Sequence, residues 1–410
     1  MSFQDKLQKY AELVARLGVN IQKDQELVIR APIECAEFAR AVAESAYKLG
    51  AKEVIVHYKD EKLMRMKYLN APLEVFESYP DWVGESENYY AKRGAAFVMI
   101  AATDPEIFKG VDSAKLAAST KAGHIALKPF NDLRDLNKIC WNIVSVPTPA
   151  WAKKVFPDCD EQTAVEKLWE AIFKAVRIDQ PNPVQAWEDH KRTLFTKSQY
   201  LNEKQFASLH FKNSLGTDIT VGMPENYIFE GGGDITSDGV YYFPNMPTEE
   251  VFSMPHKDKV NGTVVSSMPL NYQGTLISEF SLTFKDGVVV DYSAKEGYEA
   301  LKRLLDTDEG AKMLGEVALV PYKSPISDMG ILFYNTLFDE NASCHFALGS
   351  AYPSCIKDGV GLSKEDLKKR GGNDSITHVD FMFGTSDMKI VATEKDGNEV
   401  TIFENGNWAI

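Results

Sequence analysis

The spacing of apolar and polar residues changes character about halfway along the chain. In the first part, apolar residues at helical spacing alternate with short unbroken apolar runs, such as residues 26–30 and 53–58. Unbroken runs of this length are typical of strands that are buried on both faces of a parallel sheet, because crossover helices cover both faces. The pattern predicts an α/β N-terminal domain with a mostly parallel sheet.

Glycine and proline mark the ends of these elements. Gly18 and Gly50 follow the first two expected helices, where glycine readily takes the left-handed backbone that ends a helix. The expected helices span residues 3–17, 35–49, 62–69, 161–176 and 184–197, and the expected strands span residues 26–30, 53–58, 95–102, 124–127 and 138–146.

This first part contains no G-x-G-x-x-G after its first strand and no G-x-x-x-x-G-K-[ST]. Nucleotide binding needs such a phosphate cradle, so we favour a scaffold that dimerises or shapes access to a site elsewhere.

From about residue 209 the apolar period shortens, and turn residues separate short strands. Asp286-Gly287 between two alternating runs is a strong hairpin signal. The expected strands span residues 208–213, 218–221, 240–243, 262–265, 274–284 and 287–292, with one helical run at 294–309. We therefore predict an α/β scaffold domain, for dimerisation or access, over residues 1–195 and an α+β, strand-rich domain over residues 196–410.

A glycine cluster, Glu230-Gly231-Gly232-Gly233-Asp234, lies in this second half. It has two interpretations: a cradle for a substrate backbone, or a wide turn between strands. We favour the turn, because glycine runs are common in turns.

Composition narrows the class of protein. The chain has 410 residues and a net charge of −14. This charge argues against a nucleic-acid-binding protein, because binding to phosphates requires clustered Lys and Arg. No signal peptide and no apolar run of the roughly 20 residues needed to cross a membrane is found. The five cysteines form no C-x-x-C pair, which indicates reduced thiols. We expect a cytoplasmic protein with no nucleic-acid or membrane partner.

Two of the seven histidines lie close to carboxylates near the C-terminus. His378 and Asp380 are two residues apart in a β-branched and aromatic run, so on a strand they share one face. A buried imidazole and carboxylate are costly unless something compensates them, and a metal ion is the simplest compensation. Cys344 next to His345 could suggest a Cys–His nucleophile, but neighbours on a strand point to opposite faces.

Four further residues fit the same interpretation. Glu250 and Glu316 lie in apolar surroundings, and Glu340 and His345 are five apart. Oxygen-rich ligation with two imidazoles suits Zn, Co, Mn or Mg, and six ligands suit a pair of metal ions. The remaining histidines are interpreted as ordinary structural residues: His57, His124, His190, His210 and His256.

Four ordered motifs resemble the aminopeptidase T family, the metallo-aminopeptidases that include the staphylococcal and streptococcal aminopeptidase S proteins. They are N-M-P-T-E-E-V-F (245–252), L-G-E-V-A-L-V (314–320), N-A-S-C-H-F-A-L-G-x-A-Y (341–352) and H-V-D-F-M-F-G (378–384). The resemblance covers the whole chain in length and motif order.

The resemblance implies a homodimeric enzyme that removes N-terminal amino acids from peptides with a free N-terminus, using two divalent metal ions. It implies that Glu316 bridges the metals or assists the water, and that Tyr352 lies at the active site. The positions that match the family's metal site are Glu250, Glu316, Glu340, His345, His378 and Asp380. Two other classes stay open: a metal-dependent hydrolase of small amides, and a non-catalytic metal- or peptide-binding protein.

Overall fold

The computed structural model describes residues 1–410, which form two compact units. Unit 1 comprises residues 1–187 and 233–247, and unit 2 comprises residues 188–232 and 248–410. The chain first passes from unit 1 to unit 2 within helix α9 (Pro183–Lys204). The domain boundary predicted after residue 195 stays a prediction.

The core of unit 1 is a four-stranded sheet in the order β2-β1-β3-β4. Every pairing in it is parallel, which confirms the predicted parallel sheet. The strands are β1 (Glu26–Pro32), β2 (Glu53–Lys59), β3 (Ala96–Ile100) and β4 (Trp141–Val144). The helices are α1 (Phe3–Leu13), α2 (Ala36–Lys48), α3 (Glu61–Asn70), α4 (Asp81–Lys92), α5 (Ser113–Ala126), α6 (Lys128–Asp135), α7 (Pro149–Val155) and α8 (Glu161–Ala175).

One predicted strand of unit 1 is wrong. Residues 124–126 belong to helix α5, whose first turn is capped by the carboxylate of Asp112, which accepts a hydrogen bond from the backbone N–H of Ala114. The helix is rich in alanine, the residue with the highest helix propensity. A short apolar run could not be assigned correctly without the longer helical segment that precedes it.

Residues 233–247 return to unit 1 and extend the edge of its sheet beside β4. The backbone N–H of Ile143 donates to the carbonyl of Pro244 at 2.7 Å, and the Asn142 amide donates to the carbonyl of Phe243 at 2.6 Å. This segment holds the short hairpin of β8 (Asp234–Ile235) and β9 (Tyr241–Tyr242). The predicted strand at 240–243 is thus confirmed only as a two-residue strand of unit 1.

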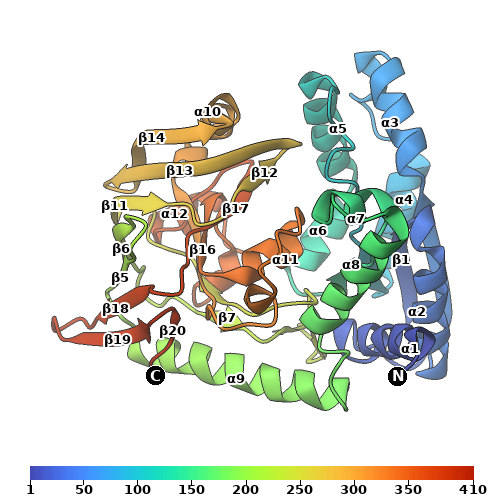
Figure 1. Ribbon diagram of the computed structural model, residues 1–410, viewed down its shortest axis with the longest axis horizontal. Helices are drawn as coiled ribbons and strands as arrows, with labels where there is room; N and C mark the ends of the chain where they lie inside the picture. The colour runs from blue at the N-terminus through green and yellow to red at the C-terminus, as the bar shows by residue number, and fades with distance from the viewer. The chain divides into compact units, whose positions relative to one another are not determined.

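Unit 2 contains two antiparallel sheets, as the strand-rich pattern predicted (Figure 1). The five-stranded sheet has the order β17-β16-β15-β10-β7, with β7 (Glu230–Gly231), β10 (Val251–Ser253), β15 (Leu314–Leu319), β16 (His345–Gly349) and β17 (His378–Met382). The larger sheet consists of β5 (Ser208–Lys212), β6 (Asp218–Gly222), β11 (Val260–Val265), β12 (Leu270–Tyr272), β13 (Thr275–Lys285), β14 (Val288–Glu296), β18 (Lys389–Thr393), β19 (Glu399–Glu404) and β20 (Asn407–Trp408). The helices of unit 2 besides α9 are α10 (Tyr298–Leu305), α11 (Thr336–Asp339) and α12 (Lys364–Lys369).

The apolar core of unit 2 lies between these two sheets. Phe346 of β16 is fully buried, with its ring centroid 4.1 Å from that of Phe383 and 5.3 Å from that of Phe211 of β5. Val317 of β15 and Phe381 of β17 belong to the same buried cluster. One face of the five-stranded sheet is therefore committed to the core, and the side chains of the alternate residues, one position before or after a core residue, point to its other face.

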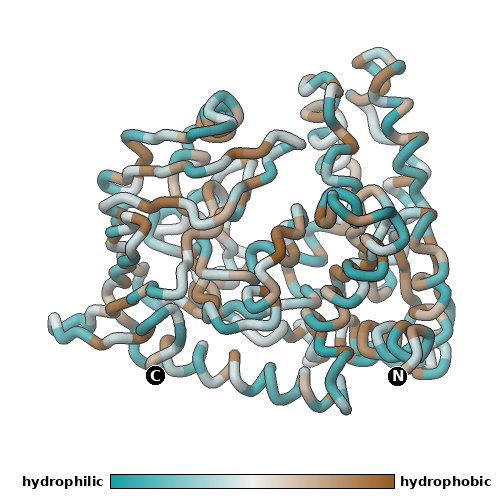
Figure 2. The backbone as a smooth tube through the Cα atoms, viewed as in Figure 1, coloured by the Kyte–Doolittle hydropathy of each residue, from teal (hydrophilic) through white to brown (hydrophobic).

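Helix α9 shows the same division between polar residues outside and apolar residues in the core. Figure 2 shows helix α9 coloured mostly as hydrophilic, although Leu194 and Leu201 on that helix are buried in the core of unit 2. No helix of the protein combines the length and the apolar character that a bilayer crossing requires.

Candidate metal centre

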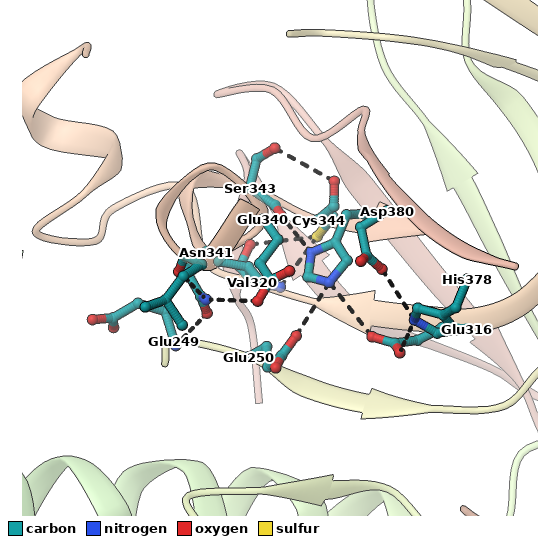
Figure 3. A network of polar contacts seen from close by, with 12 residues as sticks. Glu249, Glu250, Glu316, Val320, Glu340, Asn341, Ser343, Cys344, His378 and Asp380 are labelled. Atoms are coloured by element: carbon teal, nitrogen blue, oxygen red, sulfur yellow. Dashed lines mark hydrogen bonds and ion pairs between the residues drawn. The ribbon is translucent and has the colours of Figure 1, made fainter. Parts of the chain in front are cut away.

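Four of the predicted site residues lie on the face of the five-stranded sheet that points away from the core: Glu316, His345, His378 and Asp380. In the register of the sheet, His345 is opposite Ala318, Asp380 is opposite Ala347, and His378 is opposite Gly349. Residues directly opposite each other in antiparallel strands point to the same face. Alternation then places the apolar neighbours in the core and brings together polar residues that are far apart in the sequence (Figure 3).

Small residues on this face leave room for the polar side chains. Gly349 has a φ of +115°, and a Cβ there would lie 2.1 Å from the carbonyl oxygen of Thr377. The pairing of β15 with β16 shifts register between Leu314 and Glu316. Such an irregularity re-aims a side chain, here the carboxylate of Glu316.

Glu250, Glu316 and His345 form the first group of possible ligands, with one atom of each within 4.8 Å of the others. The Nε2 atom of His345 is 3.1 Å from Oε2 of Glu250 and 3.5 Å from Oε1 of Glu316. Its Nδ1 lies 3.2 Å from the carbonyl of Ser343. With a metal ion bound, a proton on Nδ1, donated to that carbonyl, would leave the Nε2 lone pair available to the ion, as metal-binding histidines require.

Glu316, His378 and Asp380 form the second group. The Nε2 atom of His378 is 3.3 Å from Oε2 of Glu316 and 3.4 Å from Oδ1 of Asp380, and its Nδ1 lies 2.7 Å from the carbonyl of Ser350. Glu316 therefore takes part in both groups, with a different oxygen facing each imidazole. This arrangement suits a carboxylate shared between two cations.

Glu340 belongs to neither group. It lies in the short turn of residues 340–342, and its Oε1 accepts a hydrogen bond at 3.4 Å from Nδ2 of Asn341. Burial, followed by the charges of Asp380 and Glu250, raises the pKa of Glu340 well above its ordinary value. Its carboxylate is thus close enough to the cluster to be repelled by it (Figure 3).

Tyr352 stands at the edge of the cluster and is 46% exposed. Its ring centroid is 4.8 Å from that of His378 and 6.1 Å from that of Phe252. The phenol is therefore a neighbour of the second group that remains open to solvent.

The carboxylates of the cluster have pKa values that are shifted in opposite directions. Burial alone would raise the pKa of Glu316, but hydrogen bonds from His345 and His378 hold it below its ordinary value. The pKa of Glu250 is raised, because burial outweighs its contact with His345. Four carboxylates thus share two imidazoles in a mostly buried site, and buried carboxylates need compensating positive charge. This set of oxygen and imidazole donors fits divalent metal ions.

Sequence reasoning selected Glu250 as a ligand, and the structure brings Glu250 rather than its neighbour Glu249 into the cluster. Glu249, only 3% exposed, points away from the cluster, with its Oε2 3.5 Å from Nε2 of His190 on α9 (Figure 3). The same analysis missed Asn341 altogether. Its only signal in the sequence is its position beside Glu340, which does not distinguish it from an ordinary turn asparagine.

Comparison with known proteins agrees with this geometry. The family model described as thermophilic metalloprotease (M29) matches residues 3–408. Aminopeptidase 2 of Geobacillus stearothermophilus is 49% identical over 407 residues, covering 99% of this chain and 98% of that protein. Aminopeptidase AmpS of Bacillus subtilis is 47% identical over 408 residues, covering 100% and 99%. The solved structure of wild-type AmpT from Thermus thermophilus has a TM-score of 0.93 at 41% identity, with all of both chains covered.

The opposite pKa shifts of Glu316 and Glu340 predict different effects of their substitution on the stability of the metal-free protein. Glu316→Gln should lower the free energy of unfolding by about 1.5–3 kcal/mol, because it removes the charge that two buried imidazoles contact. Glu340→Gln should leave it unchanged or raise it, because burial and neighbouring charges disfavour that carboxylate. Chemical denaturation of both variants in excess chelator at neutral pH measures the difference. A larger loss of stability in Glu340→Gln than in Glu316→Gln would contradict this account of the cluster.

Proposed function

Since the chain belongs to the thermophilic metalloprotease (M29) family, we propose that the cluster around Glu316 is its catalytic centre and holds two divalent metal ions. The chain is an aminopeptidase of that family. The observation that carries the two-metal proposal is the position of Glu316, whose two oxygens face two different groups of ligands. We propose peptides with a free N-terminus as substrates and a homodimer as the assembly.

In this proposal the ligands divide between the two groups. Glu250 and His345 hold one ion, His378 and Asp380 hold the other, and Glu316 contributes to both. Glu340 completes the set from the adjoining turn. The ions are Zn, Co, Mn or Mg. A bound divalent metal lowers the pKa of water toward about 7 and polarises a carbonyl group.

The protein's own side chains then have separate tasks. Glu316 either stays shared between the two ions or accepts the proton that the attacking water releases. Tyr352 donates a hydrogen bond from its phenol, which is neutral at pH 7, to the oxyanion that forms on the scissile carbonyl. A carboxylate oxygen near the site that does not bind an ion would accept a hydrogen bond from the ammonium group of the substrate, which selects peptides with a free N-terminus.

Removal of metal tests the proposed function directly. Leu- and Arg-p-nitroanilide should be hydrolysed, activity should disappear after dialysis against a chelator, and Zn or Co should restore it. N-acetylated substrates should remain intact, because they lack the ammonium group. Equal hydrolysis of acetylated substrates would instead indicate a hydrolase of small amides. Metal binding without any hydrolysis would indicate a binding protein.

Glu316→Gln tests the role of the central carboxylate. Loss of a general base should lower kcat by about 10²–10⁴-fold. Glu249→Gln is the matched control, because Glu249 is an equally buried carboxylate that points away from the cluster. Metal content must be measured beside kcat in both variants. Near-normal turnover in metal-loaded Glu316→Gln would remove Glu316 from the proton transfer.

Tyr352→Phe tests the oxyanion contact. Loss of one oxyanion donor should lower kcat by about 10²-fold while KM changes little. Tyr298→Phe serves as control, since Tyr298 is an exposed tyrosine of α10 that stacks on Tyr292. Unchanged kcat in Tyr352→Phe would show that the phenol takes no part in the reaction.

A further inference from the structure

Asn341 connects two separate segments of the chain, residues 337–341 and Glu249, although it is neither charged nor part of either ligand group. Its Oδ1 accepts a hydrogen bond from the backbone N–H of Glu249 at 2.7 Å. Its Nδ2 donates to the carbonyl of Leu337 at 3.0 Å and to Oε1 of Glu340 at 3.4 Å. The side chain is 0% exposed, so water cannot replace these partners without a rearrangement.

These contacts fix two carboxylates of the site at once. The N–H of Glu249 belongs to the residue immediately before Glu250, which leads into β10. The carboxylate of Glu340 is contacted directly. Figure 3 shows Asn341 between Glu249 and Glu340, on the side of the cluster opposite His378. One amide therefore sets the position of Glu340 relative to the strand that carries Glu250.

Such a connection is needed because the two carboxylates repel each other. Asn341 is the side chain that donates a hydrogen bond to the Glu340 carboxylate. Without a donor on that side, the carboxylate would be free to rotate away from the cluster. A ligand that has to be reoriented binds metal more weakly than one held in place, because ordering it costs conformational entropy.

The turn that carries Glu340 is also held at its other end. The carboxylate of Asp339 accepts hydrogen bonds from the backbone N–H groups of Phe333 at 2.7 Å and Asn335 at 3.0 Å. These bonds stabilise the turn but do not contact any member of the cluster. Only the Asn341 side chain contacts both the Glu340 carboxylate and the segment that leads into β10.

We propose that Asn341 is a positioning residue that holds Glu340 and the Glu250 strand in the arrangement that the metal site requires. This inference rests on the proposed function, in which both carboxylates are ligands. Asn341 itself contacts neither substrate nor metal and acts through the two glutamates.

The matched control is Asn202. Its side chain also accepts one backbone hydrogen bond and donates one, with the N–H and carbonyl of Phe229 at 2.6 and 2.9 Å. It belongs to the same unit and contacts none of the proposed ligands. Asn202→Ala therefore removes the same kind of backbone bonds as Asn341→Ala and leaves the cluster alone.

The experiment measures the affinity of the chelator-treated protein for Zn, by competition with a chromophoric chelator. Asn341→Ala should bind Zn about 10–100-fold more weakly than the wild type, whereas Asn202→Ala should bind as the wild type does. Equal affinities in the two variants would overturn the proposal. If Asn341→Ala does not fold, Asn341→Ser replaces it, since its hydroxyl can still accept the N–H of Glu249, and the same criterion applies.

A double-mutant cycle with Glu340→Gln separates positioning from general destabilisation. If Asn341 acts through the Glu340 carboxylate, Asn341→Ala should weaken Zn binding much less in the Glu340→Gln background than in the wild type. Equal losses in both backgrounds would overturn the proposal.

The same measurements separate this inference from the proposed function. If Glu250→Gln and Glu340→Gln leave Zn affinity unchanged, the assignment of ligands fails. If those two substitutions weaken binding and Asn341→Ala does not, only the role of Asn341 fails.

Discussion

The crowding of carboxylates on one face of a buried sheet is the constraint on which unit 2 depends. Glu316 and Asp380 share that face with two imidazoles, Glu250 and Glu340 adjoin it from neighbouring segments, and burial raises the pKa of Glu250 and Glu340. An arrangement of this kind opposes folding unless positive charge compensates it. The rest of unit 2 supplies the opposing stabilisation, because the reverse face of the same sheet packs into an apolar core.

In the five-stranded sheet, side chains alternate between the two faces, so that one strand can serve both the apolar core and the polar site. Strands β15, β16 and β17 each contribute apolar residues to the core and polar residues to the site, so that Val317 and Phe346 stabilise what Glu316 and His345 would otherwise disrupt. The order β17-β16-β15-β10-β7 brings together segments that lie more than a hundred residues apart in the sequence. The site is therefore a property of the sheet register, and no single motif contains it.

A structural feature could be predicted from the sequence when its cause is local, and could not when it depends on contacts between distant segments. The same-face placement of His378 and Asp380 depends only on strand alternation, and the structure has it. The orientation of Glu249 against Glu250 depends on the tertiary structure, because either acid could face inward on an extended segment. The role of Asn341 depends on partners from other segments, which periodicity cannot reveal. The wrong strand at 124–127 arose because four residues were interpreted without the helix that contains them.

The return of residues 233–247 to unit 1 has a consequence for biosynthesis. The edge of β4 obtains its backbone partner at Pro244 only after the intervening strands of unit 2, β5, β6 and β7, have been made. A chain emerging from the ribosome thus exposes an unpaired edge of the parallel sheet while it completes a stretch of the second unit, and exposed edges promote association with other chains. Completion of the first unit during translation must therefore wait for part of the second, which ties the order of folding to the order of synthesis.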